Sequence, residues 1–406
     1  RDNKLILISL TMLKKYNKHI KKEIKKDSYK ISLLFDESDS ISNYHCKTTK
    51  AVMNCFRKAS YKLLMTGTTT RNNVNELYPQ IELLYNNSIN MLCECEQVYK
   101  EGKLTKDLEL TKNKFYNKPF SGYFGFGLWK SCFCPSKVTV FGAEKDTQYI
   151  YNKEKLDNLI QKTIITRTLE EITGKDMVNI QQMQVRQNDS EKELYEIILN
   201  EFFKMLKYFK QTGNSRKDNL LRIIQQLKTM IKACSIPQVF SEYNNVKLPN
   251  KTIKIINMIQ SKNERFCIGC TLKDTAKFYY KELLKLDRKV FYIDGETSWE
   301  NRQEIIKEFQ NDDNFNSILI CTQQSLSSSA NIPKCKNVII ESLQWNIPKI
   351  SQFYGRFIRF NTKELVNVYF VNYIETIEQN ILLLLMNKEK INNYIKTQDV
   401  ETNEEV

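Results

Sequence analysis

The sequence lacks the long apolar segments that mark membrane proteins. Residues 381–386 form an apolar run, but it is much shorter than the ~20 residues that a helix needs to cross a bilayer. No segment has the basic, apolar and small-residue pattern of a secretory signal peptide. These absences argue against a membrane-embedded or secreted protein.

Cysteine is present but forms no recognisable disulfide framework. Eleven cysteines are scattered along the chain, which favours a reducing, cytoplasmic environment. The motifs Cys93-x-Cys95 and Cys132-x-Cys134 raise a zinc-binding hypothesis. Structural zinc sites usually place about two to four residues between paired ligands, so the single intervening residue is unusual for zinc.

A phosphate-binding loop of the type Gly-x-x-x-x-Gly-Lys-Ser/Thr is also missing from the 406 residues, which open at Arg1.

Positive charge, in contrast, is abundant, with a net charge of +15 and a pI of about 9.1. Such a balance favours a polyanionic partner, and nucleic acid before a membrane surface. Lysines recur in a helix predicted over residues 11–26, where they either follow a DNA backbone or form a solvated face.

An acidic pair follows an apolar run at residues 31–35. This pattern predicts a buried parallel strand whose carboxyl end carries Asp36 and Glu37, which is the edge where α/β sheets hold their chemistry. Such a pair suits nucleotide hydrolysis, because Asp36 can hold Mg²⁺ through its water shell while Glu37 orients the attacking water. The alternative is a plain solvated turn.

Two further segments carry related chemistry. A second apolar strand ends in the turn Thr66-Gly67-Thr68, whose threonines either couple two sites or merely cap the turn. Far downstream, Arg356 and Arg359 lie three residues apart on one predicted helix face, which suits the gripping of phosphate oxygens.

In this order, the three segments resemble motifs II, III and VI of superfamily 2 helicases and translocases, which include the DEAD/DEAH-box proteins. Residues 66–77 resemble the Swi/Snf-type branch most, and the resemblance covers nearly the whole chain except residues 90–155. It implies an α/β fold class with two RecA-like parallel-sheet lobes and a helical insertion between them. It also implies ATP and Mg²⁺ as cofactors.

The resemblance assigns roles residue by residue. The implied catalytic residues are Asp36, Glu37, Gln352, Arg356 and Arg359. The implied nucleotide-binding residues are Asp36, which also holds the metal, with Gly355, Arg356 and Arg359. The implied coupling and nucleic-acid residues are Ser9, Thr11, Thr66, Gly67, Thr68, Thr322, Asn331 and Trp345. Trp345 has the alternative of a core anchor, and residues 322–332 depart from the family by carrying serines where paired glycines are usual.

The expected domains follow the same resemblance. They are the remainder of the first lobe (1–89, opening with a strand at 5–8), an aromatic and basic insertion (90–155), a return segment with a helical hairpin (156–245), the second lobe (246–397) and an acidic tail (398–406). In the second lobe, helices and strands alternate regularly from residue 251, which predicts a parallel sheet covered on both faces. Cys267-x-x-Cys270 has redox dithiol spacing but lies inside this alternation.

The resemblance also places the missing phosphate loop upstream of Arg1, so the sequence is expected to be a fragment that is inactive alone. Usage rich in lysine, asparagine and isoleucine suggests an AT-rich genome, and a phage or another mobile element is the expected source. The expected function is ATP-dependent movement along nucleic acid, with double-stranded DNA as the expected partner. The alternatives are a non-hydrolysing two-lobe clamp and a zinc module on a structural scaffold.

Overall fold

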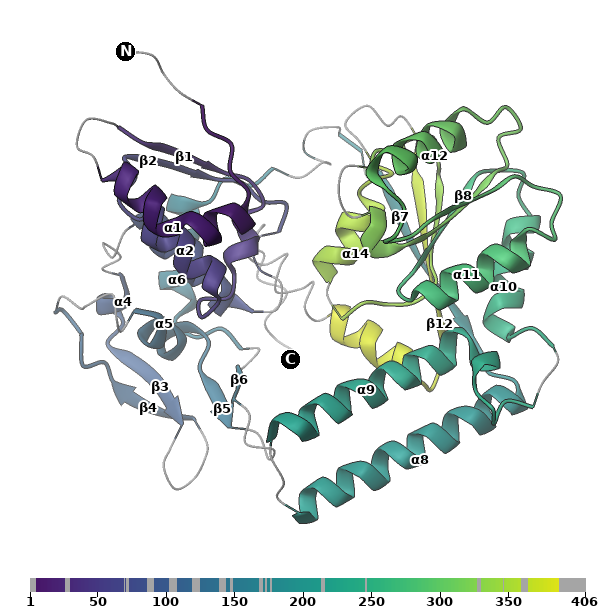
Figure 1. The fold of residues 1–406 in the computed structure, drawn as a ribbon. Coiled ribbons are helices and arrows are strands. Elements are labelled where there is room, and N and C mark those ends of the chain that lie inside the picture. Colours follow the sequence, from purple (N-terminus) through teal and green to yellow (C-terminus); the bar gives the residue numbers. More distant parts are fainter. Residues whose placement is uncertain are drawn as a thin grey trace. The chain divides into compact units, whose positions relative to one another are not determined.

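The computed structural model shows two compact units, Arg1–Thr166 with Asn387–Val406, and Arg167–Met386 (Figure 1). The structure describes residues 5–25, 30–68, 70, 73–85, 91–101, 108–118, 125–138, 144–146, 149–167, 171, 174, 175, 177–212, 216–244, 247–326, 330–345, 347–358 and 364–386.

The first unit opens with helices and strands in alternation. Helix α1 (Leu10–Ile24) is followed by β1 (Ser32–Phe35), α2 (Lys47–Phe56) and β2 (Tyr61–Leu64). Strands β1 and β2 pair in parallel, with Phe35 opposite Leu64, as expected of a β-α-β unit. A small core holds the helices on one face of this sheet, and it contains Leu13, Phe35, Ile41, Val52, Cys55 and Leu83.

The strand expected at residues 5–8 is wrong. These residues have no regular secondary structure, and the side chains of Leu5 and Leu7 are 88% and 90% exposed. A strand needs a neighbour to satisfy its backbone N–H and C=O groups, and none of the described strands lies beside this segment. The apolar composition of residues 5–8 is therefore not sufficient to make them a strand.

The insertion forms a small packed region of the first unit. Helix α3 (Tyr78–Tyr85) precedes the insertion, and α6 (Lys153–Thr163) begins at its end. Between them lie α4 (Met91–Glu94), the antiparallel hairpin of β3 (Gln97–Glu101) and β4 (Leu108–Lys112), α5 (Gly125–Phe133), and the antiparallel pair β5 (Ser136–Val138) and β6 (Glu144–Asp146). Trp129 and Phe133 are fully buried here, so these aromatic side chains serve as core. No group of three or more His, Cys, Asp or Glu suited to a metal occurs among the described residues, and the side chain of Cys93 lies outside them.

The second unit contains a parallel sheet of six strands in the order β7-β12-β11-β8-β10-β9. These strands are β7 (Val178–Val185), β8 (Phe266–Cys270), β9 (Val290–Ile293), β10 (Ile318–Thr322), β11 (Asn337–Ile340) and β12 (Val366–Tyr373). The helices are α8 (Asp189–Thr212), α9 (Arg216–Ser235), α10 (Asn250–Gln260), α11 (Lys273–Leu283), α12 (Trp299–Asn311), α13 (Gln323–Leu326), α14 (Ile347–Tyr354) and one over residues 377–386.

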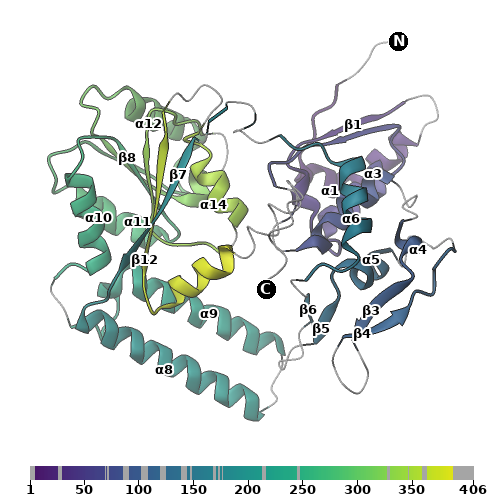
Figure 2. The same ribbon diagram turned by 180° about the vertical axis from the view of Figure 1, so that it is seen from behind.

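Helices cover both faces of this sheet. Figures 1 and 2 show α10 and α11 on one side and α14 on the other, while α8 and α9 run side by side as an antiparallel hairpin. Strands β8, β10 and β11 are buried at every residue, as the central strands of a doubly covered parallel sheet must be. The expected α/β class is therefore confirmed.

The sheet begins earlier in the chain than expected. Strand β7 pairs with β12 over eight residues, from Val178 opposite Val366 to Val185 opposite Tyr373. A start of the second lobe at residue 246 leaves out this strand and the α8–α9 hairpin, both of which belong to the second unit. Strand β7 is largely exposed, as an edge strand of a sheet is, and it lies within the residues expected to form a return segment.

The buried cysteines of the second unit are structural. Cys267 and Cys270 are fully buried on β8, and desolvation raises the pKa of both thiols well above the usual value. Thiols with raised pKa values form little of the reactive thiolate, so a redox role for this pair has no support.

In the described part of the chain, no helix is both long and apolar enough to cross a membrane.

Candidate functional site

The acidic pair lies at the carboxyl edge of the first sheet, beside the threonine turn. The backbone N–H of Met65 donates to the carbonyl oxygen of Phe35 at 2.8 Å, and the N–H of Ser38 donates to the carbonyl oxygen of Met65 at 2.9 Å. These two bonds fix the turn that carries Asp36 and Glu37 against the start of the turn at Thr66. Parallel pairing has this effect because the carboxyl ends of adjacent strands meet at one edge.

Both carboxylates of the pair are exposed. The backbone N–H of Glu37 donates to Oδ1 of Asp36 at 3.0 Å, and Glu37 has a left-handed backbone with φ of 51°. A non-glycine residue seldom adopts this conformation, and such residues cluster at functional turns. Exposed carboxylate oxygens at a sheet edge are the hard ligands that Mg²⁺ prefers, so Asp36 fits a hydrated Mg²⁺ ion.

A buried polar contact supports the acidic turn from behind. The hydroxyl of Ser38 donates to Oε1 of Gln80 on α3 at 2.9 Å, and both residues are buried. Sequence reasoning did not identify Gln80 because the contact spans 42 residues and leaves no local signal. Ser38 and Gln80 are therefore positioning residues for Asp36 and Glu37.

The threonine turn has an internal hydrogen-bond pattern. The hydroxyl of Thr66 accepts from the N–H of Thr68 at 3.1 Å and donates to the carbonyl oxygen of Thr68 at 2.9 Å. Thr66 thus caps the turn, which was the alternative reading of this residue. At Gly67 an added Cβ would meet no atom within 4 Å, so packing does not require glycine there. The coupling role of the three residues stays a prediction.

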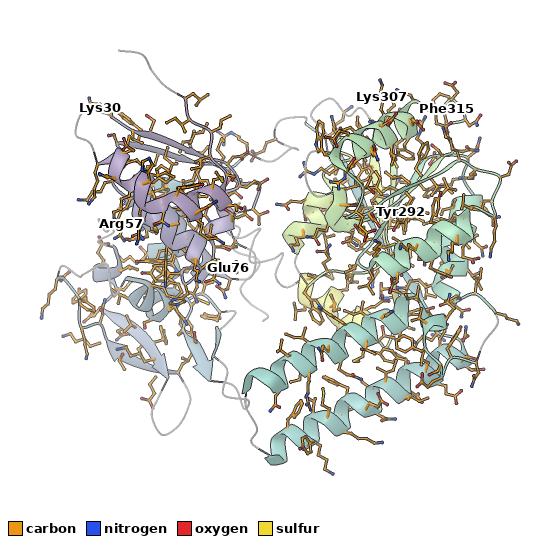
Figure 3. All side chains as sticks on the ribbon, in the orientation of Figure 1. Lys30, Arg57, Glu76, Tyr292, Lys307 and Phe315 are labelled. Carbon is orange, nitrogen blue, oxygen red and sulfur yellow. The ribbon has the colours of Figure 1, made fainter. Side chains whose placement is uncertain are left out.

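Helix α2 and strand β2 are tied to α3 by two basic side chains. Arg57, labelled in Figure 3, forms an ion pair with the buried carboxylate of Glu82. Nζ of Lys62 donates to the carbonyl oxygens of Arg57 and Leu83 at 2.7 and 2.8 Å. Desolvation, with Arg57 nearby, lowers the pKa of Lys62. These contacts hold β2, and hence the Thr66 turn, in place.

The predicted nucleic-acid residues Ser9 and Thr11 lie at the amino end of α1. Ser9 is the N-cap, and its hydroxyl accepts from the N–H of Met12 at 3.3 Å. Leu13 packs into the core, and Thr11 is exposed. The lysines of the helix that are exposed are Lys14, Lys15, Lys18, Lys22 and Lys25.

In the second unit, α14 and the turn after it carry the predicted phosphate-binding residues. Gln352 and Arg356 are half-buried, while Phe353 and Phe357 are fully buried and anchor the segment. An added Cβ at Gly355 would lie 2.8 Å from the carbonyl oxygen of Ser351, so this close turn requires glycine. Arg359 lies outside the described residues.

The segment after β10 meets the Arg356 turn directly. The N–H of Ile332 donates to the carbonyl oxygen of Arg356 at 2.9 Å, which places Asn331 beside that turn. Thr322, the last residue of β10, is buried, and its carbonyl oxygen accepts from the hydroxyl of Ser325 at 2.7 Å. The predicted serines at 327–329 lie outside the described residues. The indole of Trp345 is 40% exposed, which argues against a core anchor.

Sequence reasoning did not single out Asp294 as a functional residue, although it stands at the carboxyl end of β9. Its carboxylate accepts from the N–H of Glu296 at 2.9 Å and from the hydroxyl of Tyr292 at 3.1 Å, and it lies 3.2 Å from Nζ of Lys273. Burial opposes ionisation, but these donors together hold the pKa of Asp294 below its usual value. Figure 3 labels Tyr292 within this sheet.

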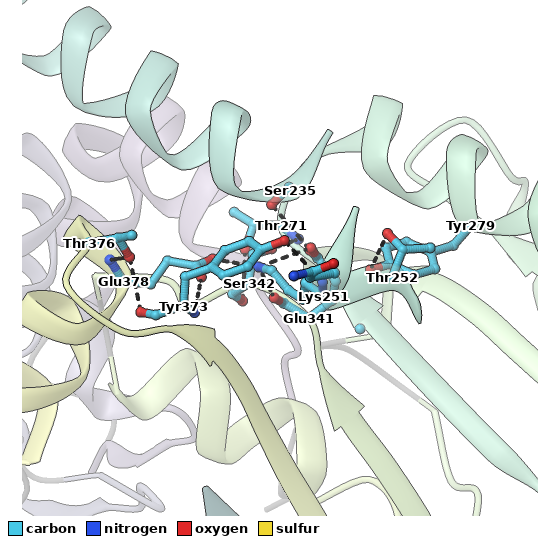
Figure 4. Close-up of polar contacts among 12 residues, drawn as sticks. Ser235, Lys251, Thr252, Thr271, Tyr279, Glu341, Ser342, Tyr373, Thr376 and Glu378 are labelled. Carbon is cyan, nitrogen blue, oxygen red and sulfur yellow. Dashed lines mark hydrogen bonds and ion pairs between the residues drawn. The ribbon is translucent and has the colours of Figure 1, made fainter. Parts of the chain in front are cut away.

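Three charged side chains meet inside the second unit (Figure 4). Nζ of Lys251 donates to Oε1 of Glu378 at 2.6 Å and lies 3.3 Å from Oε1 of Glu341. The N–H of Tyr373 donates to Oε2 of Glu378 at 2.9 Å, and its hydroxyl accepts from the N–H of Lys251 at 3.0 Å. This network joins α10 to the carboxyl ends of β11 and β12, so its role is structural.

Each unit thus carries its own part of the predicted site. Asp36, Glu37 and the Thr66 turn are brought together in the first unit, and Gln352, Gly355 and Arg356 in the second.

Solved structures with a similar fold include two ATPase domains. The Sulfolobus solfataricus SWI2/SNF2 ATPase core in complex with dsDNA is 19% identical with a TM-score of 0.45, and the match covers 96% of this chain and 72% of that chain. The C-terminal part of the Fun30 ATPase domain is 15% identical with a TM-score of 0.42, and the match covers 57% of this chain and 99% of that chain.

Sequence comparisons find related proteins. An uncharacterized ATP-dependent helicase of Mycoplasma pneumoniae is 25% identical over 69% of this chain, and the TATA-binding protein-associated factor MOT1 of Saccharomyces cerevisiae is 23% identical over 92% of it. The transcription regulatory protein SNF2 of the same yeast is 20% identical over 87% of this chain. The chain spans only 28%, 21% and 20% of the lengths of these proteins.

Residues 249–361 match the family model of the helicase conserved C-terminal domain. A phage source gains no support from the bacterial and yeast relatives. The resemblance of the ordered motifs to superfamily 2 helicases of the Swi/Snf type is confirmed by the helicase C-terminal match and by the similarity to MOT1 and SNF2.

Proposed function

We propose that this chain is part of an ATP-dependent translocase or helicase that moves along double-stranded DNA. The observation that carries the proposal is the backbone pairing that holds Asp36 and Glu37 beside the Thr66 turn at one sheet edge. The match of residues 249–361 to the helicase C-terminal domain supports it from the other unit. The relative from Mycoplasma pneumoniae is named an uncharacterized ATP-dependent helicase, which agrees with this proposal.

In this proposal the carboxylates and the arginines act on one nucleotide. Asp36 would hold hydrated Mg²⁺, which neutralises phosphate charge when it is bound, and Glu37 would orient the attacking water and accept its proton. Arg356 and Arg359 would stabilise the charge on the transferred phosphoryl group. Gln352 would assist at the same phosphate, and Gly355 lets the backbone turn closely enough to present Arg356.

The cations of the chain support the choice of nucleic acid. The net charge is +15, and exposed lysines follow the length of α1 behind the Ser9 cap. Thr66, Gly67, Thr68, Thr322, Asn331 and Trp345 would couple nucleotide binding to strand contact. We place the protein in the cytoplasm, because eleven cysteines without a recognisable disulfide framework favour a reducing environment.

The test is ATP hydrolysis by the complete gene product with and without duplex DNA. Glu37→Gln should reduce the DNA-stimulated rate by about 10² or more, and Arg356→Ala by about 10³, with DNA binding retained. The matched controls Glu154→Gln and Arg222→Ala change exposed residues on α6 and α9 and should leave the rate unchanged. Unchanged turnover in both site variants would remove these residues from the mechanism.

The alternative function is a non-hydrolysing two-lobe clamp, which the similarity to ATP-dependent helicases does not favour. The complete gene product distinguishes the two functions. A Gly-Lys-Ser or Gly-Lys-Thr loop with DNA-stimulated turnover supports the motor. DNA binding without any ATP turnover supports the clamp.

A further inference from the structure

The first unit contains a hollow that the proposed ATP and duplex contacts do not use. It has a volume of about 360 Å³ and lies between the β3–β4 hairpin and α5. Its walls include Val98 and Lys100 from β3, Lys114 and Phe115 from the turn after β4, and Gly127 and Leu128 from α5. We call it the insertion hollow.

The floor of the insertion hollow is apolar and preformed. Val98 and Leu128 are 2% and 7% exposed, so they belong to the packed core of the insertion. The amide of Asn113 donates to the carbonyl oxygens of Leu92 and Cys95, both at 2.8 Å, and its Oδ1 accepts from the N–H of Phe115 at 3.0 Å. These bonds fix the turn that carries Phe115, so the wall does not have to form when a ligand binds.

The rim of the hollow is positively charged. Lys100 and Lys114 are exposed, and no acidic residue is among its lining residues. The strand register places Glu109 opposite Lys100, but Glu109 is not among the residues that line the hollow. Apolar walls below two ammonium groups suit a ligand that is flat and apolar at one end and anionic at the other.

We propose that the insertion hollow binds one unpaired nucleotide of a single-stranded nucleic acid. The base would enter the apolar hollow beside Phe115, and the adjoining phosphates would contact Lys100 and Lys114. Aromatic side chains and cationic rims are the usual combination for such strands, and about 360 Å³ lies at the lower end of ligand-pocket volumes. This site is separate from the proposed duplex contacts and does not depend on ATP hydrolysis.

Gly127 permits a sharp test. An added Cβ at Gly127 would meet no atom within 4 Å, so Gly127→Leu should fill the hollow without a backbone clash. Because glycine is a poor helix former, the change should also leave α5 at least as stable. A fluorescently labelled 15-mer of thymidylate is the probe, and its anisotropy reports binding. We expect the affinity of Gly127→Leu to be about tenfold weaker, with an unchanged urea unfolding midpoint.

A pair of charge variants tests the rim independently of folding. Lys100→Gln with Lys114→Gln should weaken binding of the 15-mer about tenfold. Lys112→Gln with Lys118→Gln removes the same charge from exposed residues near the hairpin that do not line the hollow, and it should weaken binding far less. A 5-iodouracil-substituted oligomer should crosslink at Phe115 on irradiation in the unmodified protein, and not in Gly127→Leu.

Three results would overturn the proposal. The first is an equal loss of affinity for the 15-mer in the two double lysine variants. The second is unchanged 15-mer binding and Phe115 crosslinking in Gly127→Leu. The third is displacement of the labelled 15-mer by polyglutamate of the same charge as effectively as by unlabelled 15-mer. The last result would identify an acidic peptide as the occupant. Because none of these measurements involves ATP, they stand apart from the failure or success of the proposed motor.

Discussion

At the residue scale, one glycine determines how closely α14 approaches the second sheet. An added Cβ at Gly269 of β8 would lie 2.5 Å from Cε1 and Cζ of Phe353. The ring therefore occupies the space that a side chain would need, and it anchors the helix that carries Gln352 and leads into the Arg356 turn.

Gly269→Ala should lower the free energy of unfolding by about 1–3 kcal/mol, because the new methyl group must displace a buried ring. Gly295→Ala is the matched control, since a Cβ there meets nothing within 4 Å. Urea unfolding monitored by circular dichroism measures both. Adding Phe353→Leu to Gly269→Ala should recover part of the loss. Equal midpoints for the two alanine variants would contradict this packing.

The buried cluster around Lys251 predicts a pH dependence. Burial raises the pKa of Glu378 to about 7, because desolvation outweighs the attraction of Lys251 and Glu341 adds repulsion. A carboxyl group whose pKa is higher in the folded state stabilises the fold most below its unfolded pKa of 4.5. That stabilisation is lost as the pH rises through about 7.

The free energy of unfolding should therefore lose a contribution on the order of 3 kcal/mol between pH 4.5 and 7. Glu378→Gln cannot titrate and resembles the protonated carboxyl group, so its unfolding free energy should stay level while that of the unmodified protein falls, and the two should separate as the pH rises over this range. Glu300→Gln, an exposed change on α12, should give a constant difference. Urea unfolding at several pH values provides the measurement. If the unfolding free energies of Glu378→Gln and the unmodified protein differed by the same amount at every pH, the raised pKa of Glu378 would be refuted.

At the scale of elements, β7 closes one edge of the second sheet. It covers β12 along eight residues, and α8 and α9 follow it directly. Without β7, an apolar strand with unpaired backbone groups would become the edge, which favours association between chains.

A fragment of residues 167–386 should therefore unfold cooperatively and remain monomeric. A fragment that begins at residue 247 should be less stable and self-associate. Size-exclusion chromatography and urea unfolding compare the two fragments at equal concentration. If the shorter fragment were as stable and as monodisperse as the longer one, β7 and the hairpin would not belong to this folding unit.

At the scale of the whole molecule, the charge balance predicts strongly salt-dependent binding to DNA. Each phosphate contact by a cation contributes about −0.9 to the slope of log affinity against log salt. On the proposed function, replacing Lys14, Lys15 and Lys18 by glutamine should make this slope shallower by about 3. Replacing the exposed Lys192, Lys204 and Lys207 of α8 is the control with equal charge. Identical slopes for the two triple variants would exclude α1 from the DNA interface.

Local patterns in the sequence were sufficient for most elements of the second unit. The strands at 290–293 and 318–322, and the helix between them, could be predicted because apolar runs bounded by turns indicate buried strands and apolar periodicity indicates a helix. The parallel strand before the acidic pair could also be predicted, but the expectation that it is buried is wrong, because Leu34 of β1 is 65% exposed and only Phe35 is buried. Residues 5–8 are an apolar run that is not a strand, because an apolar run forms a strand only where an adjacent strand can pair with it.

The sequence by itself determined the order of the motifs, the parallel α/β class and the net charge, because composition and short-range periodicity encode them. Only the tertiary structure decided that polar β7 completes a sheet with residues 188 positions away, that Gln80 supports the acidic turn, and that Lys251 lies among carboxylates. These features depend on contacts between distant segments. Long-range pairing leaves no periodic trace in the chain, because either partner alone resembles an ordinary polar residue on a surface.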